Sequence, residues 1–597
     1  MTVHSSRIGQ SDHTRAEGSA PAGLGLAWRF MTISSEPRRP HSDDDSELGF
    51  KKAKAVRWLS PSMLVNTAGR VLLSSVFGEY LDKRDLQKSL PSTIFQELGD
   101  GHEVWFDFVA DLGDGFDSTY SIAYLLAQDH LSVDGLEPLP RGQFLMMGGD
   151  EVYPTPTWER YQDKTKGPYE AAMPLTPKDS PSPNMYALPG NHDWYDGLTS
   201  FMRLFAKSGK HHIGGWRAEQ TRSYFAIELP QHWWLFAIDT QFGAYIDDAQ
   251  LAYFKAAAAK LEPGDRVVLC APTPSWVEAV DDPGVYDAID YFVRVVLNPV
   301  HADIKLMLSG DLHHYAHYAA TEGNRQLIHC GGGGAYLYPT HRMPEQIPVP
   351  PPRPRTHTQS EKTSTYNLAA TFPTKARSRR YALGVFGRVP TRNLGFIGML
   401  GGLQTLLLLA FLGLFEHVGE LTQKWLELPI GLACLLVMTG AILFAKLPTG
   451  GSRNGGRRLV LGGIHGLVQI GIGILGTWGW SRLTFIHDRW PWPIFATLIY
   501  FVVMGLISTL IFCAYLLIAG AFGVNVDELF SGQSIIDSKS FLRLHIDASG
   551  ALTVHPVAVP RVSRKWRATP TASAHAPWLE PAKPIGYELA EAPIVIR

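Results

Sequence analysis

The chain has 597 residues, 45% of them hydrophobic, with 54 basic and 56 acidic side chains. This length exceeds one ordinary core and predicts two to four domains, while the near-balance of charge gives no electrostatic reason to expect a nucleic-acid partner. The four cysteines are scattered and suggest no disulfide framework, which is typical of a reducing compartment.

The N-terminal part of the chain is polar. Residues 1–50 are rich in Ser, Arg, Asp and Pro and lack the apolar core of a signal peptide, so we expect a disordered polar tail. We predict a helical lead-in over residues 51–100, because apolar residues recur at roughly helical spacing between Ala55 and Arg84. This spacing predicts one or two packed helices or, alternatively, helices that lie on a membrane surface.

From Val104 onward, short apolar runs alternate with helical stretches. Such alternation predicts an α/β sheet. We predict strands over Val104–Ala110, Phe144–Met147, Met185–Leu188, Arg266–Leu269 and Ile304–Leu308, a hairpin over Tyr224–Thr240, and helices over Ser118–Gln128 and from about Asp196.

A polar cluster follows each of the five predicted strands. The carboxyl ends of strands in an α/β sheet meet at the edge where such proteins hold ligands, so we expect the clusters to form one site. The clusters are Asp111-Leu112-Gly113, Gly149-Asp150-Glu151-Val152-Tyr153, Gly190-Asn191-His192-Asp193, Cys270-Ala271-Pro272 and Gly310-Asp311-Leu312-His313-His314.

In this order the clusters resemble the motif series of the calcineurin-like metallophosphoesterases in their purple-acid-phosphatase-like form. That series reads DxG, GDxxY, GNHD, VxxH and GHxH, and the first three motifs are intact here. The resemblance spans roughly Val104–His341 and implies a metallophosphoesterase domain over residues 101–345, with the fold of a β-sandwich with flanking helices. It also implies a hydrolase that uses two divalent or trivalent metal ions (Fe, Zn or Mn) to act on a phosphomonoester or phosphodiester.

For the first metal ion, the resemblance implies the ligands Asp111, Asp150, Tyr153 and His313. Gly113 stands where many relatives have a histidine ligand, and the phenol of Tyr153 compensates for it. Two adjacent metal ions need a shared carboxylate, and Asp150 is the natural bridge.

For the second metal ion, the resemblance implies Asp150, Asn191 and the ends of the last two motifs. Here Cys270 replaces the histidine of VxxH, and Asp311 replaces the first histidine of GHxH. A thiolate and a carboxylate still bind Zn or Fe, with different charge and softness from two imidazoles. Cys270 is alternatively a small buried residue at a strand end.

Four further side chains are candidates for work on the substrate. His192 is the candidate for donating a proton to the leaving group, with Asp193 as the partner that orients it. His314 and His341 are second-tier candidates for holding the substrate phosphate, and His341 follows the glycine run Gly331–Gly334. Each of these histidines is alternatively a surface or packed residue.

Two segments separate the motifs from the rest of the chain. The Pro-rich insertion Glu151–Asn184 interrupts the strand order and predicts an irregular cap over the site or, alternatively, a solvent loop. Residues 346–392 are Pro-rich and then basic, which predicts an extended linker.

Four apolar runs follow, each about as long as the ~20 residues needed to cross a bilayer. Ten basic residues flank one side of these runs against three on the other, which predicts a multi-pass membrane protein with both termini and the phosphoesterase domain in the cytoplasm. The runs are almost free of charge and favour an anchor over a transporter. His465, in the third run, is either functional or bonded in neutral form to a neighbouring helix. Within residues 393–524 the runs are Asn393–Phe415, Leu428–Leu447, Leu459–Trp480 and Trp492–Gly523.

The C-terminal segment, residues 525–597, returns to soluble composition. Phe541–Ile546 and Leu552–Val557 flank a Ser-Gly pair and predict a small β hairpin. For the whole chain, the first hypothesis is a membrane-anchored metallophosphoesterase whose partners are a phosphate ester and the lipid bilayer. The alternative is a degenerate phosphoesterase fold acting as a non-catalytic binding or regulatory membrane module, because Cys270 and Asp311 replace two imidazoles.

Overall fold

The computed structural model describes residues 45–64, 84–99, 101–174, 182–240, 245–354, 358–416, 423–446, 455–483, 490–570 and 576–597. Most of the predicted polar tail lies outside these ranges. The predicted helical lead-in is described in part. Residues 51–60 are not helical, one helical turn covers residues 61–64, a short 3-10 helix covers Arg84–Ser89 and a strand covers Phe95–Gln96, so the prediction is wrong for residues 51–60 and 95–96.

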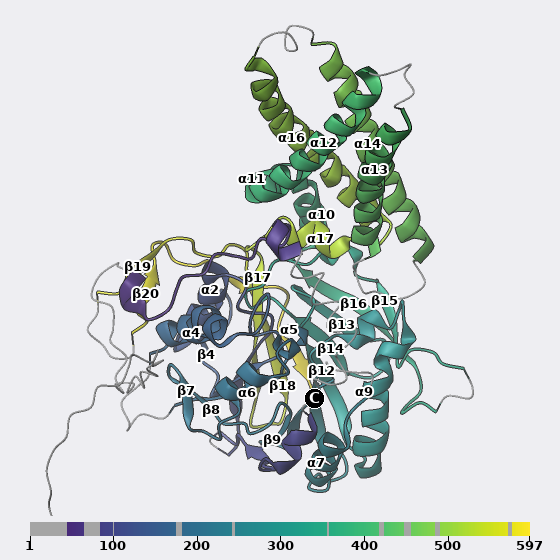
Figure 1. Ribbon diagram of the computed structural model, residues 1–597. Coiled ribbons are helices and arrows are strands. Elements are labelled where there is room, and N and C mark those ends of the chain that lie inside the picture. Colours follow the sequence, from purple (N-terminus) through teal and green to yellow (C-terminus); the bar gives the residue numbers. More distant parts are fainter. Residues whose placement is uncertain are drawn as a thin grey trace, which may run out of the picture. The chain divides into compact units, whose positions relative to one another are not determined.

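Two nine-stranded sheets dominate the described residues outside the apolar helices (Figure 1). In order across the first sheet, the strands are β1 (Phe95–Gln96), β9 (Phe225–Leu229), β10 (Trp233–Ala237), β11 (Arg266–Cys270), β12 (Asp303–Ser309), β14 (Gln326–Cys330), β13 (Tyr315–Ala320), β16 (Ser364–Phe372) and β15 (Gln346–Val349). The second sheet contains β21 (Glu588–Leu589), β18 (Leu552–Val559), β17 (Lys539–Ile546), β2 (Val104–Val109), β5 (Phe144–Met147), β6 (Asn184–Ala187), β8 (Trp216–Ala218) and β7 (His211–Ile213), with β22 (Ile594–Ile596) beside β18.

The sheets are the inner layers of a mixed α/β sandwich. One hydrophobic cluster lies between them and takes side chains from both, including Phe106, Tyr186, Leu235 and Leu308. Two further clusters cover the outer faces, which explains why the central strands are apolar on both sides. The helices packed there are α2 (Phe116–Leu126), α4 (Gly167–Ala172) and α6 (Thr199–Phe205) on the second sheet, and α7 (Asp248–Ala258) and α9 (Asp287–Phe292) on the first.

The predicted strands are confirmed to within one residue. The helix expected from about Asp196 is present as α6, which begins at Thr199, and the single turn α5 (Asn191–Trp194) precedes it. One other prediction is wrong. The insertion expected to be irregular is helical over α3 (Trp158–Tyr161), a π-helical turn (Gln162–Lys166) and α4. Its buried aromatic residues, Tyr161 and Tyr169, pack into the outer core of the second sheet and hold it there.

Residues 346–392 do not form an extended linker. They contribute β15 and β16 to the first sheet, followed by α10 (Lys375–Leu383) and α11 (Val385–Arg392). The strand pairing of β16 with β13 supplies the backbone hydrogen bonds that an isolated linker would lack.

The predicted C-terminal hairpin is present as β17 and β18, and it lies inside the second sheet. β17 pairs antiparallel with β2, from the start of the domain. The fully buried Arg543 on β17 forms a two-pronged ion pair with Asp107 on β2, with Nε–Oδ1 at 2.7 Å and Nη2–Oδ2 at 3.0 Å. The hairpin is therefore a structural part of the sandwich.

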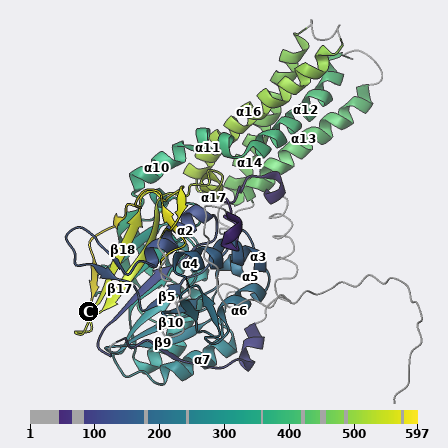
Figure 2. The same cartoon turned by 90° about the vertical axis from the view of Figure 1, so that its left-hand side faces the viewer.

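Four helices in the described part of the chain are long and apolar enough to cross a membrane, as the sequence predicts. They lie together (Figures 1 and 2), and the pairs α12–α16 and α13–α14 are in contact. His465 stacks on Tyr515 of the neighbouring helix, with ring centroids 4.4 Å apart. The helices are α12 (Leu394–Glu416), α13 (Gln423–Lys446), α14 (Gly455–Ser481) and α16 (Trp492–Ala521), and the short α17 (Val526–Ser531) follows.

Candidate functional site

Three strands end in an aspartate whose backbone has a positive φ. Asp111 follows β2 with φ 61°, Asp150 follows β5 with φ 56°, and Asp311 follows β12 with φ 67°. Residues other than glycine rarely adopt this conformation, and such strained positions concentrate at functional sites. The polar clusters of the sequence therefore begin at turns that the surrounding structure must hold in place.

The phenol of Tyr153 is the point at which these turns meet. Its hydroxyl oxygen lies 2.9 Å from Asp111 Oδ1, 2.8 Å from Asp150 Oδ2 and 2.9 Å from His313 Nε2. All four side chains are buried. The four predicted ligands of the first metal ion thus converge, although they come from three strand ends in two different sheets.

The converging carboxylates have strongly shifted acidities. Burial, with the nearby charges of Asp150 and Asp311, raises the pKa of Asp111 well above its ordinary value. Burial and the charge of Asp193 raise the pKa of Asp150 to about 8, and burial with Asp150 raises the pKa of Asp311 to about 7. Burial and the repulsion between these carboxylates therefore disfavour their charged forms, and a bound cation would relieve that repulsion.

The imidazole of His313 presents a lone pair to this cluster. Its Nδ1 lies 2.8 Å from the carbonyl oxygen of Tyr336, and because a carbonyl only accepts, Nδ1 carries the hydrogen. Burial, with the positive charges of Lys539 and His192, lowers the pKa of His313 to about 3. The ring is neutral, and its Nε2 is oriented as in a metal-ligating histidine.

Asn191 begins α5 beside Asp150. Its side-chain oxygen is buried and has no hydrogen-bond partner among the described residues, which is an uncommon and costly state for an amide oxygen. The preceding residue, Gly190, approaches Asp150 so closely that a Cβ there would overlap the Asp150 carboxylate. Gly190 therefore allows the GNHD turn to reach the acidic cluster.

His192 and Asp193 have separate partners. Nδ1 of His192 donates to the carbonyl oxygen of Pro154 at 2.9 Å. The Asp193 carboxylate instead accepts from the Gly190 and Glu151 amides at 2.9 and 3.3 Å and from the Tyr161 hydroxyl. Pro154, rather than Asp193, thus orients the His192 ring, and Asp193 fixes the turn.

The two replaced second-site positions differ in their surroundings. Asp311 is half-buried, and its charge acts on Asp111. Cys270 lies in the hydrophobic cluster between the sheets, and burial raises the pKa of its thiol. These surroundings favour the interpretation of Cys270 as a small buried residue over its interpretation as a metal ligand.

The two second-tier histidines lie away from the Tyr153 hydroxyl. His314 is buried against His329, with the two Nε2 atoms 3.0 Å apart. His341 is half-buried, with its Nδ1 2.8 Å from the Ser378 hydroxyl on α10. Their described contacts are those of packed histidines.

Four residues that sequence reasoning did not place at the site support it. Lys164, in the helical insertion, donates to the carbonyl oxygens of Asp114 and Tyr153 at 2.9 and 2.7 Å. Tyr161, also in the insertion, donates to Asp193. Lys539, on β17, donates to the carbonyl oxygen of Ala335 at 2.5 Å, and its charge acts on His313. The ring of Trp58 contacts the rings of Tyr153, His192 and Tyr336, at centroid distances of 6.2, 6.0 and 5.4 Å.

Within the described ranges, no three His, Cys, Asp or Glu side chains alone form a ready-made metal cluster. The converging side chains around Asp111, Asp150 and His313 include the phenol of Tyr153, and tyrosine is not one of those four residue types. Two carboxylates, a phenol, an imidazole lone pair and the unpartnered Asn191 oxygen form a donor set suited to Fe, Zn or Mn. We conclude that the residues present fit a metal centre.

The fold and the site define a mixed α/β sandwich with a buried acidic cluster, joined to four apolar helices. Among solved structures, the chain is similar to one described as "Structure of PhoD", with a TM-score of 0.28 and 11% identity over 47% of this chain and 70% of that chain. No protein-family model and no curated protein matches the chain.

Proposed function

We propose that this protein is a membrane-anchored, metal-dependent phosphoesterase with a calcineurin-like fold, which hydrolyses a phosphomonoester or a phosphodiester. The observation that carries the proposal is the convergence of Asp111, Asp150 and His313 on the Tyr153 hydroxyl. The four apolar helices support an anchor in the bilayer.

The metal centre that we propose is held by Asp111, Asp150, Tyr153 and His313, with Asn191 and Asp311 toward a second ion. Bound metal ions would supply water activation and neutralisation of the phosphate oxygens. In this proposal, Asp150 is the carboxylate that two such ions would share.

The chain's own residues act on the leaving group and on solvent. Because Nδ1 of His192 is committed to Pro154, the other ring nitrogen, Nε2, is the one that holds or releases a proton toward the leaving oxygen. Trp58 lies against His192 and Tyr153 and limits the access of water to that side of the cluster. Asp193 keeps the turn that carries His192 in place.

The proposal is tested on the full-length protein purified in detergent. We expect elemental analysis to find up to two Fe, Zn or Mn ions per chain, and we expect hydrolysis of p-nitrophenyl phosphate or bis(p-nitrophenyl) phosphate that a chelator abolishes and added metal restores. A well-folded protein without bound metal and without turnover would refute the proposal.

A substitution at Gly190 tests the close approach to Asp150. Gly190→Ala is expected to push the Asp150 carboxylate out of the cluster and to lower hydrolysis by roughly tenfold or more, since a displacement of about 1 Å in a site costs that much. The matched control is Gly586→Ala, where a Cβ meets nothing within 4 Å. Equal activity of the two variants would count against the placement of Asp150.

A non-catalytic binding or regulatory module is the second candidate, and one observation favours it. The resembling family has a histidine ligand at this position, whereas Cys270 stands here with its side chain in the hydrophobic cluster between the sheets. The second ion would therefore lack that imidazole. One bound metal ion with measurable phosphate affinity and no turnover would support this candidate over the first.

We further propose that both termini and the sandwich face the cytoplasm, because basic residues are concentrated in the segments on that side of the apolar helices. A fluorescent protein fused after Arg597 should then be fluorescent in cells. If an external protease cleaved the fused protein in intact cells, the C-terminus would lie outside and the proposed orientation would be wrong.

A further inference from the structure

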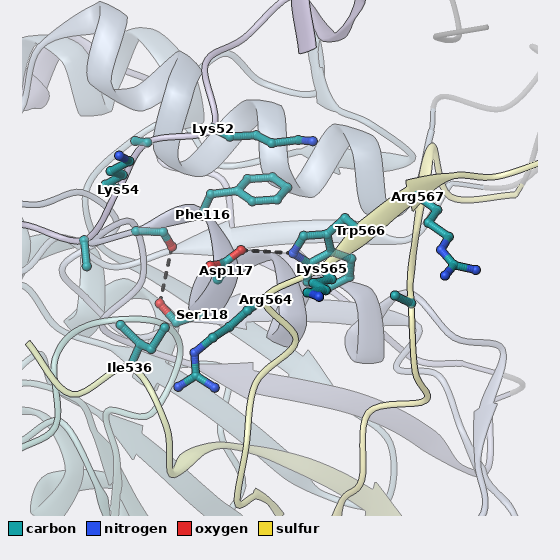
Figure 3. Close-up of a pocket in the computed structure, with 14 residues that line it drawn as sticks. Lys52, Lys54, Phe116, Asp117, Ser118, Ile536, Arg564, Lys565, Trp566 and Arg567 are labelled. Atoms are coloured by element: carbon teal, nitrogen blue, oxygen red, sulfur yellow. Dashed lines mark hydrogen bonds between the residues drawn. The ribbon is translucent and has the colours of Figure 1, made fainter. Parts of the chain in front are cut away.

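A pocket of about 630 Å³ opens beside the N-terminus of α2 (Figure 3). Its walls come from separate parts of the chain: residues 52–55, 115–118 and 564–567, with Ile536 and Ala582. The ligands proposed for the metal centre do not line it. The pocket is therefore a second concave site with its own chemistry.

Basic side chains dominate the lining of this pocket. The lining has five basic residues and one acidic residue, Asp117, and four of the five basic residues are exposed. The five basic residues are Lys52, Lys54, Arg564, Lys565 and Arg567. A concentration of one sign of charge in a concave surface attracts ligands of the opposite sign.

The acidic groups near the pocket do not cancel this charge. Asp117 accepts a hydrogen bond from the Trp566 indole at 3.0 Å, and burial raises its pKa, which disfavours its negative charge (Figure 3). Arg564 forms an ion pair with Asp537 at 2.7 Å. Lys54, Lys565 and Arg567 add three further basic side chains to the lining.

The backbone adds to the positive potential. α2 is eleven residues long and begins after Gly115, which has no side chain to cap the first amides. A helix N-terminus carries a partial positive charge that favours anions, including phosphate. The aromatic rings of Phe116 and Trp566, 6.0 Å apart and edge to face, line the same pocket.

The pocket lies near the point where the chain enters the apolar helices. Arg392, the last residue of α11, precedes α12 by one residue. Arg392 donates to the carbonyl oxygens of Gln533, at 2.6 Å, and Ser534, and Ile536, two residues further along, lines the pocket. A bilayer spanned by α12 would bring lipid head groups to the same region.

We propose that this basic pocket binds the phosphate group of an anionic ligand, either the head group of a membrane phospholipid or a soluble phosphate compound. The proposal rests on the cavity, its basic lining and the helix N-terminus, and it does not depend on hydrolysis at the acidic cluster.

The test uses full-length protein in detergent, treated with EDTA so that the metal centre does not contribute. Isothermal titration calorimetry is performed with dihexanoyl phosphatidic acid, inorganic phosphate and dihexanoyl phosphatidylcholine. We expect saturable binding of at least one of the two anions and weaker binding of the zwitterion. Charge reversal in Lys54→Glu/Lys565→Glu is expected to weaken anion binding by roughly tenfold or more, because two nearby charges change sign.

The matched control is Lys255→Glu/Lys260→Glu, two exposed lysines on and just after α7 that do not line the pocket. Binding of phosphatidic acid alone would identify a lipid head group as the ligand, and binding of inorganic phosphate would identify a soluble one. No saturable binding, or equal losses in the pocket and control variants, would overturn the proposal.

Discussion

Replacing Asp150 by alanine in the full-length protein is expected to abolish phosphate-ester hydrolysis, with a loss of at least about a thousandfold. Asp150 is buried, contacts the Tyr153 hydroxyl through Oδ2 and accepts from the His192 amide through Oδ1 at 2.8 Å. Its removal takes away the carboxylate shared by both proposed metal ions and also loosens the turn that carries His192. The measurements are initial rates with p-nitrophenyl phosphate and the metal content per chain.

Asp281→Ala is the control for this variant, since Asp281 is an exposed aspartate outside the cluster. We expect it to retain the rate and metal content of the unmodified protein. If Asp150→Ala kept both its metal and its activity, the cluster around Tyr153 would not be the catalytic site. If Asp150→Ala lost its metal and the unmodified protein also showed no turnover, the non-catalytic binding module would be favoured.

Replacing Arg543 by methionine is expected to lower the free energy of unfolding of the sandwich by about 3–5 kcal/mol. The change leaves Asp107 buried without its charged partner, and it also removes the hydrogen bond from Arg543 to the carbonyl oxygen of Leu139 at 3.0 Å. Urea unfolding followed by tryptophan fluorescence measures the effect.

Two further variants show whether the loss comes from the unpaired charge. Arg567→Met, an exposed arginine in the same C-terminal segment, is expected to change stability by less than about 0.5 kcal/mol. The double variant Asp107→Leu/Arg543→Met should recover part of the loss, because no uncompensated charge remains. If Arg543→Met were as stable as Arg567→Met, β17 would not be held to β2 as described.

The parts of the molecule that follow from local pattern were predictable from the sequence. Five apolar runs give five strands, and the polar turns after β2, β5 and β6 share the carboxyl edge of one sheet while those after β11 and β12 share that of the other. The four apolar helices follow from length and composition alone. These features depend on neighbouring residues in the sequence, which is why periodicity and turn residues reveal them.

The rest depends on contacts between distant residues. Nothing near Arg543 indicates that it pairs with Asp107, 436 residues away in the sequence, and nothing near Lys164 indicates that it braces the turns at Asp114 and Tyr153. The insertion is too Pro-rich to predict as helical, and only its buried tyrosines reveal its role. The surroundings of Cys270 also required the packing of two sheets to be known.

The pairing of β17 with β2 has a consequence for biosynthesis. The ribosome completes β2 before any of the four apolar helices and β17 only after all of them, so the second sheet stays unfinished while those helices are synthesised. Its exposed strand edge then needs protection, for example by a chaperone, until the residues after Ala521 emerge. If the helices cross a bilayer as proposed, the same pairing requires the polypeptide to return to the side from which it entered, which an even number of crossings achieves.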